Sequence, residues 1–82
     1  MYRLVYTSNP NMTHHLQQDF DVYVDNNLRA IDKDGKGFTT SKIEDSTALA
    51  EGGIIVKTQN SVYIFAFISS NLVSDYSGFG FY

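Results

Sequence analysis

The chain has 82 residues, no cysteine, and nine acidic against six basic residues, for a formal charge of −3. This length indicates one domain, residues 1–82, near the size at which burial barely outweighs chain entropy. The absence of cysteine excludes a disulfide framework and a thiolate metal site. The Lys and Arg residues are scattered rather than clustered, which disfavours nucleic acid as a partner.

The N-terminal sequence carries no basic lead followed by an apolar stretch, so no secretory signal is predicted. No apolar run approaches the ~18 residues needed to span a bilayer. We therefore predict a cytoplasmic protein with no membrane contact. Aromatic residues make up 15% of the chain, which suits a small core built from large rings.

The chain is predicted to begin with a strand and a short helix. Residues 2–7 alternate weakly between apolar and polar types and predict the strand. Residues 8–11 contain the single proline and end it. Residues 12–18 then allow a short helix, with Asn11 or Thr13 as its cap.

Residues 19–31 allow two interpretations. Apolar and polar residues alternate over 20–25, which favours a strand with its acids facing water. Helical spacing is satisfied as well, by Leu16, Phe20, Val24, Leu28 and Ile31. Val22 would lie off that helical stripe, and the Asn pair at 26–27 suits a tight turn. We therefore favour two strands, the second over 28–32.

The second half of the chain is predicted to be mostly strand. Residues 33–37 form a turn, and the Thr-rich, β-branched residues 38–43 a strand. Residues 44–51 are either one short helical turn, capped by Asp45, or a loop. Residues 54–58 and 61–68 form a hairpin. Its second strand contains the apolar run 62–68, too short for a buried helix, which predicts a central strand covered on both faces.

These elements predict a mostly β fold, a small curled antiparallel sheet or open barrel of about five or six strands. One or two short helices, near residues 12–18 and 45–51, would cover an end. The alternative is an α+β fold with a helix at 13–31 packed on an antiparallel sheet. No internal repeat or low-complexity tract is visible.

One segment resembles the opening of an EF-hand calcium loop. Asp32, Asp34 and Gly37 match the ligands at positions one and three and the glycine at position six of that family. Lys36 and Ile43 stand at positions five and twelve, where the family places oxygen ligands. The resemblance implies a calcium-binding module as one alternative. The substitutions favour a solvated turn between strands, and we predict no metal and no other cofactor.

His14 and His15 are candidate metal ligands together with Asp19 or Asp21, because imidazole and carboxylate suit zinc. Adjacent histidines point in different directions on a helix or a strand, which favours two exposed loop histidines instead.

No catalytic site is predicted. Asp19, Asp21 and Asp25 would line a solvated strand face without the cleft that acid–base chemistry needs. The sequence contains no G-x-S-x-G nucleophile pattern and no glycine-rich phosphate-binding loop. We therefore expect a protein that is not an enzyme.

Exposed Tyr and Asp side chains are the first candidate for partner binding. Tyr23 would share one strand face with Asp21 and Asp25. A Tyr among carboxylates offers contact area at little entropy cost. These three residues are therefore predicted to contact a partner.

The aromatic C-terminus is the second candidate. Phe79 and Phe81 alternate with glycine, and Tyr82 follows them. The pattern allows a final strand that packs on the core and closes a small barrel, an anchor that inserts into a partner, or a base-stacking surface. The acidic balance of the chain disfavours base stacking. We include all three residues among the predicted partner-binding residues.

Three β-rich segments, 38–43, 54–58 and 61–65, resemble in texture and size the small accessory proteins of bacteriophages. This resemblance implies a protein that binds and blocks one host protein. The predicted function is a non-enzymatic interaction protein with a protein partner, such as a phage-encoded inhibitor or regulator of a host protein. The alternatives are a homo-oligomeric structural subunit and a small ligand or calcium-binding module.

Overall fold

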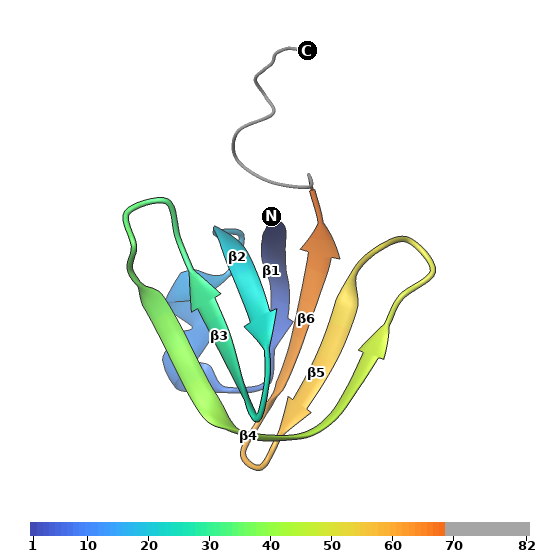
Figure 1. Cartoon of the computed structure of the whole chain (residues 1–82). Helices are drawn as coiled ribbons and strands as arrows, with labels where there is room; N and C mark the ends of the chain where they lie inside the picture. Colours follow the sequence, from blue (N-terminus) through green and yellow to red (C-terminus); the bar gives the residue numbers. More distant parts are fainter. Residues whose placement is uncertain (69–82) are drawn as a thin grey trace.

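The computed structural model describes residues 1–68, which form a ring of six antiparallel strands and a short 3-10 helix (Figure 1). In chain order these are β1 (Tyr2–Thr7), η1 (Pro10–His15), β2 (Asp19–Val24), β3 (Asn27–Ile31), β4 (Gly37–Ala48), β5 (Ile54–Thr58) and β6 (Val62–Phe67). Consecutive strands pair with each other, and β6 returns to pair with β1. The mostly β fold class is confirmed, although bulges and a short β1–β2 pairing keep the ring from being a regular barrel.

The predicted pair of strands within residues 19–31 is confirmed, and the alternative helix over 13–31 is wrong. β2 and β3 form a hairpin whose last pair before the turn is Val24 with Leu28. Phe20 is fully buried, as the alternating pattern requires of the core-facing side. Cross-strand pairing and a one-sided core therefore decide the conformation of this segment over its helical spacing.

The helix predicted over 12–18 is a 3-10 helix that begins earlier, at Pro10. Its cap is Asn9 rather than Asn11 or Thr13, and the Asn9 side chain accepts a hydrogen bond from the Asn11 backbone N–H at 3.0 Å. Proline suits the start of a helix because the N–H that it lacks would have no helical partner there. In the part of the chain that the structure describes, no helix is long and apolar enough to cross a membrane.

β4 continues to Ala48, so the helical turn predicted within 45–51 is wrong. The end of β4 pairs in register with β5, from Asp45 opposite Lys57 to Ala48 opposite Ile54. An isolated helix of this length is marginal in water because its nucleation is costly. Pairing with β5 satisfies the same backbone groups without a new nucleus, which favours the strand.

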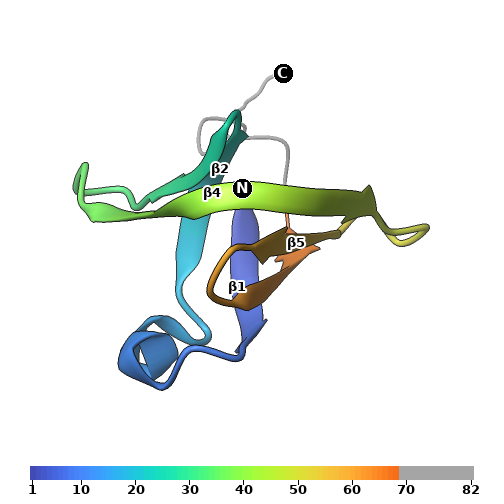
Figure 2. The same ribbon diagram turned by 90° about the horizontal axis from the view of Figure 1, so that it is seen from below.

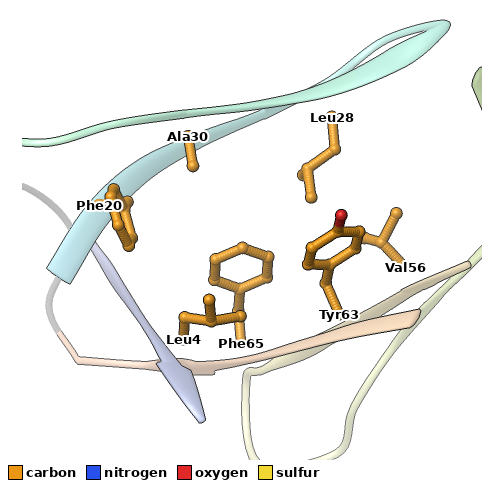
Figure 3. Close-up of a cluster of buried hydrophobic side chains, with 7 residues drawn as sticks. All are labelled: Leu4, Phe20, Leu28, Ala30, Val56, Tyr63 and Phe65. Atoms are coloured by element: carbon orange, nitrogen blue, oxygen red, sulfur yellow. The ribbon is translucent and has the colours of Figure 1, made fainter. Parts of the chain in front are cut away.

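The core lies inside the ring and is built from both halves of the chain. It consists of Leu4, Phe20, Leu28, Ala30, Val56, Tyr63 and Phe65. Figure 3 shows the side chains of β1, β5 and β6 meeting those of β2 and β3 across the interior. Phe38 and His15 extend this cluster, with ring centroids 5.0 Å apart, and Phe38 also lies 5.4 Å from Phe20. η1 therefore lies against the core through His15.

The prediction that residues 62–68 are covered on both faces is wrong. Tyr63 and Phe65 face the core and are buried, but Ile64 between them faces outward and is half-buried. Ala66, the next outward residue of β6, is half-buried as well. A single ring of strands has one interior, and no second layer of the described chain lies over the outside of β6. The outer side of this apolar strand is therefore left at the surface.

Candidate interaction surface

A bulge in β1 turns two successive side chains outward. Leu4 pairs with Phe65 and Tyr6 pairs with Ile64, so Val5 is an extra residue in β1 relative to β6. An extra residue of this kind bends the strand and re-aims its side chains. Leu4 is buried, whereas Val5 is 40% exposed and Tyr6 is 48% exposed. The bulge therefore adds one apolar side chain to the outside of the ring.

Tyr6 is the first member of a row that crosses three adjacent strands. It pairs with Ile64 on β6, and Ile64 pairs with Ile55 on β5. Paired residues lie on the same side of a sheet, so these side chains neighbour each other on the outside. Figure 1 shows β1, β6 and β5 as neighbouring strands. We call the set Val5, Tyr6, Ile55, Ile64 and Ala66 the outer apolar face.

One end of the outer apolar face is hollowed beside the end of β6. The apolar residues that line the hollow are Val5, Leu49, Ile64, Phe65, Ala66 and Phe67, of which Phe65 and Phe67 alternate toward the inside of the ring. Gly53 lets the β4–β5 loop approach β6 closely, because a Cβ there would lie 2.5 Å from the backbone oxygen of Phe65. Glu51 contributes the carboxylate in the lining. The hollow is thus an apolar depression lined by residues of β1, β6 and the β4–β5 loop. Figure 2 shows the long strand β4 and the loop that joins it to β5, as seen from below.

The border of the outer apolar face on the β4 side is acidic. Glu44 Oε1 lies 4.0 Å from Lys57 Nζ, and both side chains are at least half exposed. Asp45 stands opposite Lys57 in the β4–β5 ladder. With Glu51 in the loop, three carboxylates and one ammonium group border this side.

An ion pair joins β1 to β2 where their pairing is short. Arg3 donates from Nε to Asp19 Oδ1 at 2.8 Å and from Nη2 to Oδ2 at 3.4 Å. The pKa of Arg3 is raised, mainly by the hydrogen bond to Asp19 and next by the negative charge of the Asp19 carboxylate. Asp19, a candidate metal ligand from the sequence, is therefore engaged by a guanidinium group.

The predicted partner residues Asp21, Tyr23 and Asp25 lie on β2 and in the turn that follows it. Asp21 and Tyr23 share the outward side of β2, as the alternation predicts, and Tyr23 is 47% exposed. Arg29, opposite Tyr23 on β3, places its guanidinium carbon 5.3 Å from the Tyr23 ring centroid. We call Asp21, Tyr23, Asp25 and Arg29 the β2–β3 face. It points away from the outer apolar face, because the inward side chains of the two sides meet in the core (Figure 3).

The remaining predicted partner residues, Phe79, Phe81 and Tyr82, lie outside the described residues. The ring of residues 1–68 closes through the pairing of β1 with β6. A closing strand at the C-terminus is therefore not needed to complete this ring.

The segment that resembles an EF-hand loop is the turn between β3 and β4. Asp32 Oδ1 accepts hydrogen bonds from the backbone N–H groups of Asp34 and Lys36, each at 2.9 Å. Gly35 has a φ of 81°, a conformation that glycine adopts without strain. The Asp and Gly residues thus have a local role, which is to shape a hairpin turn.

The two histidines lie at the end of η1, with ring centroids 4.0 Å apart. His15 Nδ1 is 3.1 Å from Gln18 Oε1, and its ring packs 5.7 Å from that of Phe20. His15 is half-buried rather than exposed as predicted, because it covers the aromatic side of the core. Within residues 1–68, no group of three or more His, Cys, Asp or Glu side chains is placed to hold a metal ion.

The outer apolar face is missed by sequence reasoning because the apolar run 62–68 predicts a strand that is covered on both sides. The signal that could have found it is the size of the chain. An 82-residue single domain of mostly strands has little chain left for a second layer over its sheet. The bulge at Val5 leaves no such signal, because it appears only in the pairing with β6.

Comparison with protein-family models, with curated proteins and with solved structures finds no match for this chain. The resemblance to small phage accessory proteins therefore stays a prediction. The chemistry of the two outer faces is the basis on which function is inferred.

Proposed function

We propose that this protein is a non-enzymatic interaction protein that binds a protein partner through the outer apolar face. The observation that carries the proposal is the continuity of this face. Tyr6, Ile64 and Ile55 are successive register partners on three strands, and the β1 bulge adds Val5. Isolated exposed apolar residues are ordinary on a protein surface, whereas a contiguous patch is typical of an interaction site.

Burial of this face would contribute to binding. Val5 is 40% and Tyr6 48% exposed, so covering them would gain part of the ~1.5–3 kcal/mol that full burial of an exposed apolar side chain is worth. Tyr6 adds an aromatic ring of the kind enriched at interfaces. Strand pairing already fixes the backbone beneath these side chains, so little ordering is needed when a partner binds.

The chemistry of the border indicates the chemistry of the partner. Glu44, Asp45 and Glu51 outnumber Lys57 beside the face. Charge complementarity between interfaces steers association and excludes wrong partners. The partner that fits is therefore a protein with an apolar patch bordered by Lys or Arg residues.

The ring also constrains how that partner binds. β6 pairs with β1 on one side and with β5 on the other. A partner strand therefore has no free backbone edge to join along β6. Side-chain packing against the outside of the ring is the mode that this geometry supports. A bound protein held in this way would be masked over one patch of its surface, which is how an inhibitor or regulator acts.

The test is capture by matched variants of the full-length chain. Val5→Lys places an ammonium group at an exposed position of the outer apolar face, and Tyr23→Lys does the same on the β2–β3 face. Each tagged variant is incubated with an extract of the cells that express the protein, and the captured proteins are identified by mass spectrometry. We expect one protein to be captured by the natural chain and by Tyr23→Lys, and to be lost with Val5→Lys.

The other outcomes are equally informative. If Tyr23→Lys loses the captured protein and Val5→Lys retains it, binding is assigned to the predicted residues Asp21, Tyr23 and Asp25. If both variants still capture the protein, neither face is its binding site. A natural chain that sediments as a dimer, with Val5→Lys as a monomer, would make a second copy the occupant and the protein a homo-oligomeric subunit.

A further inference from the structure

The described chain ends at the border of the hollow. The Ile68 N–H donates to the Met1 backbone oxygen at 2.9 Å, which continues the β6–β1 pairing past Phe67. Ala66 lines the hollow, and Ile68, two residues further and so on the same side of the chain, is 41% exposed. Residues 69–82 therefore begin beside an apolar surface.

The composition of residues 69–82 matches that surface. The segment contains the large apolar or aromatic residues Leu72, Val73, Tyr76, Phe79, Phe81 and Tyr82. Asp75 is its one charged side chain. Segments that remain solvated are poor in aromatic residues and rich in charge, which is the opposite composition.

The segment is also long enough to reach back over the face. Ile64 lies four residues before Ile68 in a strand, which is ~13 Å at the usual rise. Phe79 lies eleven residues after Ile68. At up to ~3.3–3.6 Å per residue, that stretch covers the distance and leaves chain for a turn.

A covalently attached ligand has an advantage over other occupants. A short linker gives an effective concentration in the millimolar range. A second copy bound face to face would bring the acidic borders of two chains together, namely Glu44, Asp45 and Glu51 from each, and like charges oppose such a contact. The nearly uncharged segment 69–82 carries no such penalty.

We infer that residues 69–82 bind the hollow of the outer apolar face in the same chain, with the rings at 79, 81 and 82 against Val5, Ile64 and Ala66. The segment would thereby compete with a partner for that face. The competition rests on the proposed function, whereas the intramolecular binding does not. Under this inference, the residues predicted to anchor a partner instead cover the surface that a partner needs.

The test uses a spin label, which the cysteine-free chain accepts at a single introduced site. Ser77→Cys in the full-length protein is labelled with a nitroxide, and the loss of amide signal is measured by NMR. We expect the amides of Val5 and Ile64 to lose most of their intensity, and those of Tyr23 and Arg29 on the opposite face to keep it. Adding Val5→Lys to the labelled chain should restore the lost intensity, and adding Tyr23→Lys should not.

Two results would overturn the inference. Intensity that is retained at Val5 and Ile64, or lost equally on both faces, would show that the segment does not bind there. A mixture of the spin-labelled chain at natural isotope abundance with the ¹⁵N-labelled chain without cysteine tests binding between copies. Signal loss at Val5 and Ile64 of the ¹⁵N-labelled chain in this mixture would mean that the segment binds another copy.

Competition with a partner is measured separately. Phe79→Ser with Phe81→Ser should raise capture of the protein retained by the natural chain, since the outer apolar face is then uncovered. Unchanged capture, together with the expected spin-label result, would support the intramolecular binding and contradict the competition. Lost capture would show that these aromatic residues bind the partner directly, and would also overturn the competition. The spin-label result is independent of whether any partner is captured.

Discussion

The two outer sides of the ring differ in whether their side chains find partners within residues 1–68. On the β2–β3 face, the exposed ring of Tyr23 is matched by the guanidinium group of Arg29 across the hairpin. On the outer apolar face, Tyr6 is followed in register by Ile64 and Ile55, which offer no polar or charged partner. The first surface is satisfied in water, and the second gains stability only when something covers it.

The difference follows from the architecture. The inward side chains of both sides, such as Phe20 and Phe65, share one core. A single ring supplies no layer over its outside, so the outward residues must be compatible with water or serve a contact. Tyr23 and Arg29 meet the first condition, whereas the outer apolar face does not meet it and, under the proposed function, serves a contact.

The largest expected effect compares Phe65, inside the ring, with Val5, on its outside. Phe65→Ala removes a fully buried ring at the centre of the core and should cost ~3–5 kcal/mol of unfolding free energy. That is comparable to the whole stability of a small domain, so much of the protein should be unfolded. Val5→Ala, on the outside, should change it by no more than ~0.5 kcal/mol. Urea denaturation followed by circular dichroism measures both, and equal costs would contradict the inside–outside assignment.

The next effect is on binding and compares the two exposed tyrosines. If Tyr6 is a hot spot of the contact, Tyr6→Ala should weaken binding of the captured partner by about 2 kcal/mol, or ~30-fold in Kd. Tyr23→Ala should change the affinity by less than ~1 kcal/mol. Titration calorimetry with each purified variant gives both values. A larger loss for Tyr23→Ala would reverse the roles of the two faces.

The smallest effect tests whether the β2–β3 face is satisfied by its own residues. Arg29→Ala should cost ~0.5–1 kcal/mol of unfolding free energy, because it removes the cation–π contact with Tyr23. Tyr23→Phe keeps a ring beneath Arg29 and is the matched control. A double-mutant cycle of Arg29→Ala with Tyr23→Ala isolates the contact. A coupling energy indistinguishable from zero would show that the two side chains do not support each other.

Much of the fold could be predicted because local patterns and tertiary pairing agree over most strands. The alternation from Phe20 to Val24 coincides with a core on one side and a hairpin partner on the other. The hairpin of 54–58 with 61–68 likewise matches β5 and β6. At these positions the pattern and the packing lead to the same structure.

The errors lie where pairing acts without a side-chain pattern. Residues 44–48 are all exposed, so nothing in their sequence marks a strand, and β5 holds them through the backbone. The extra residue at Val5 likewise depends on β6, sixty positions away in the chain. The candidate surface depends on both of these pairings, together with the absence of a covering layer in the described chain. For that reason sequence reasoning selected the acids and tyrosine of β2 instead.

The most direct test of the proposal that the outer apolar face binds a partner is NMR shift mapping with the captured partner. The amide spectrum of the full-length protein is recorded with increasing amounts of that protein. We predict that the largest changes occur at Val5, Tyr6, Ile55 and Ile64, while Tyr23 and Arg29 are unaffected. Changes concentrated on β2 and β3, with those of β1, β5 and β6 unmoved, would contradict the account.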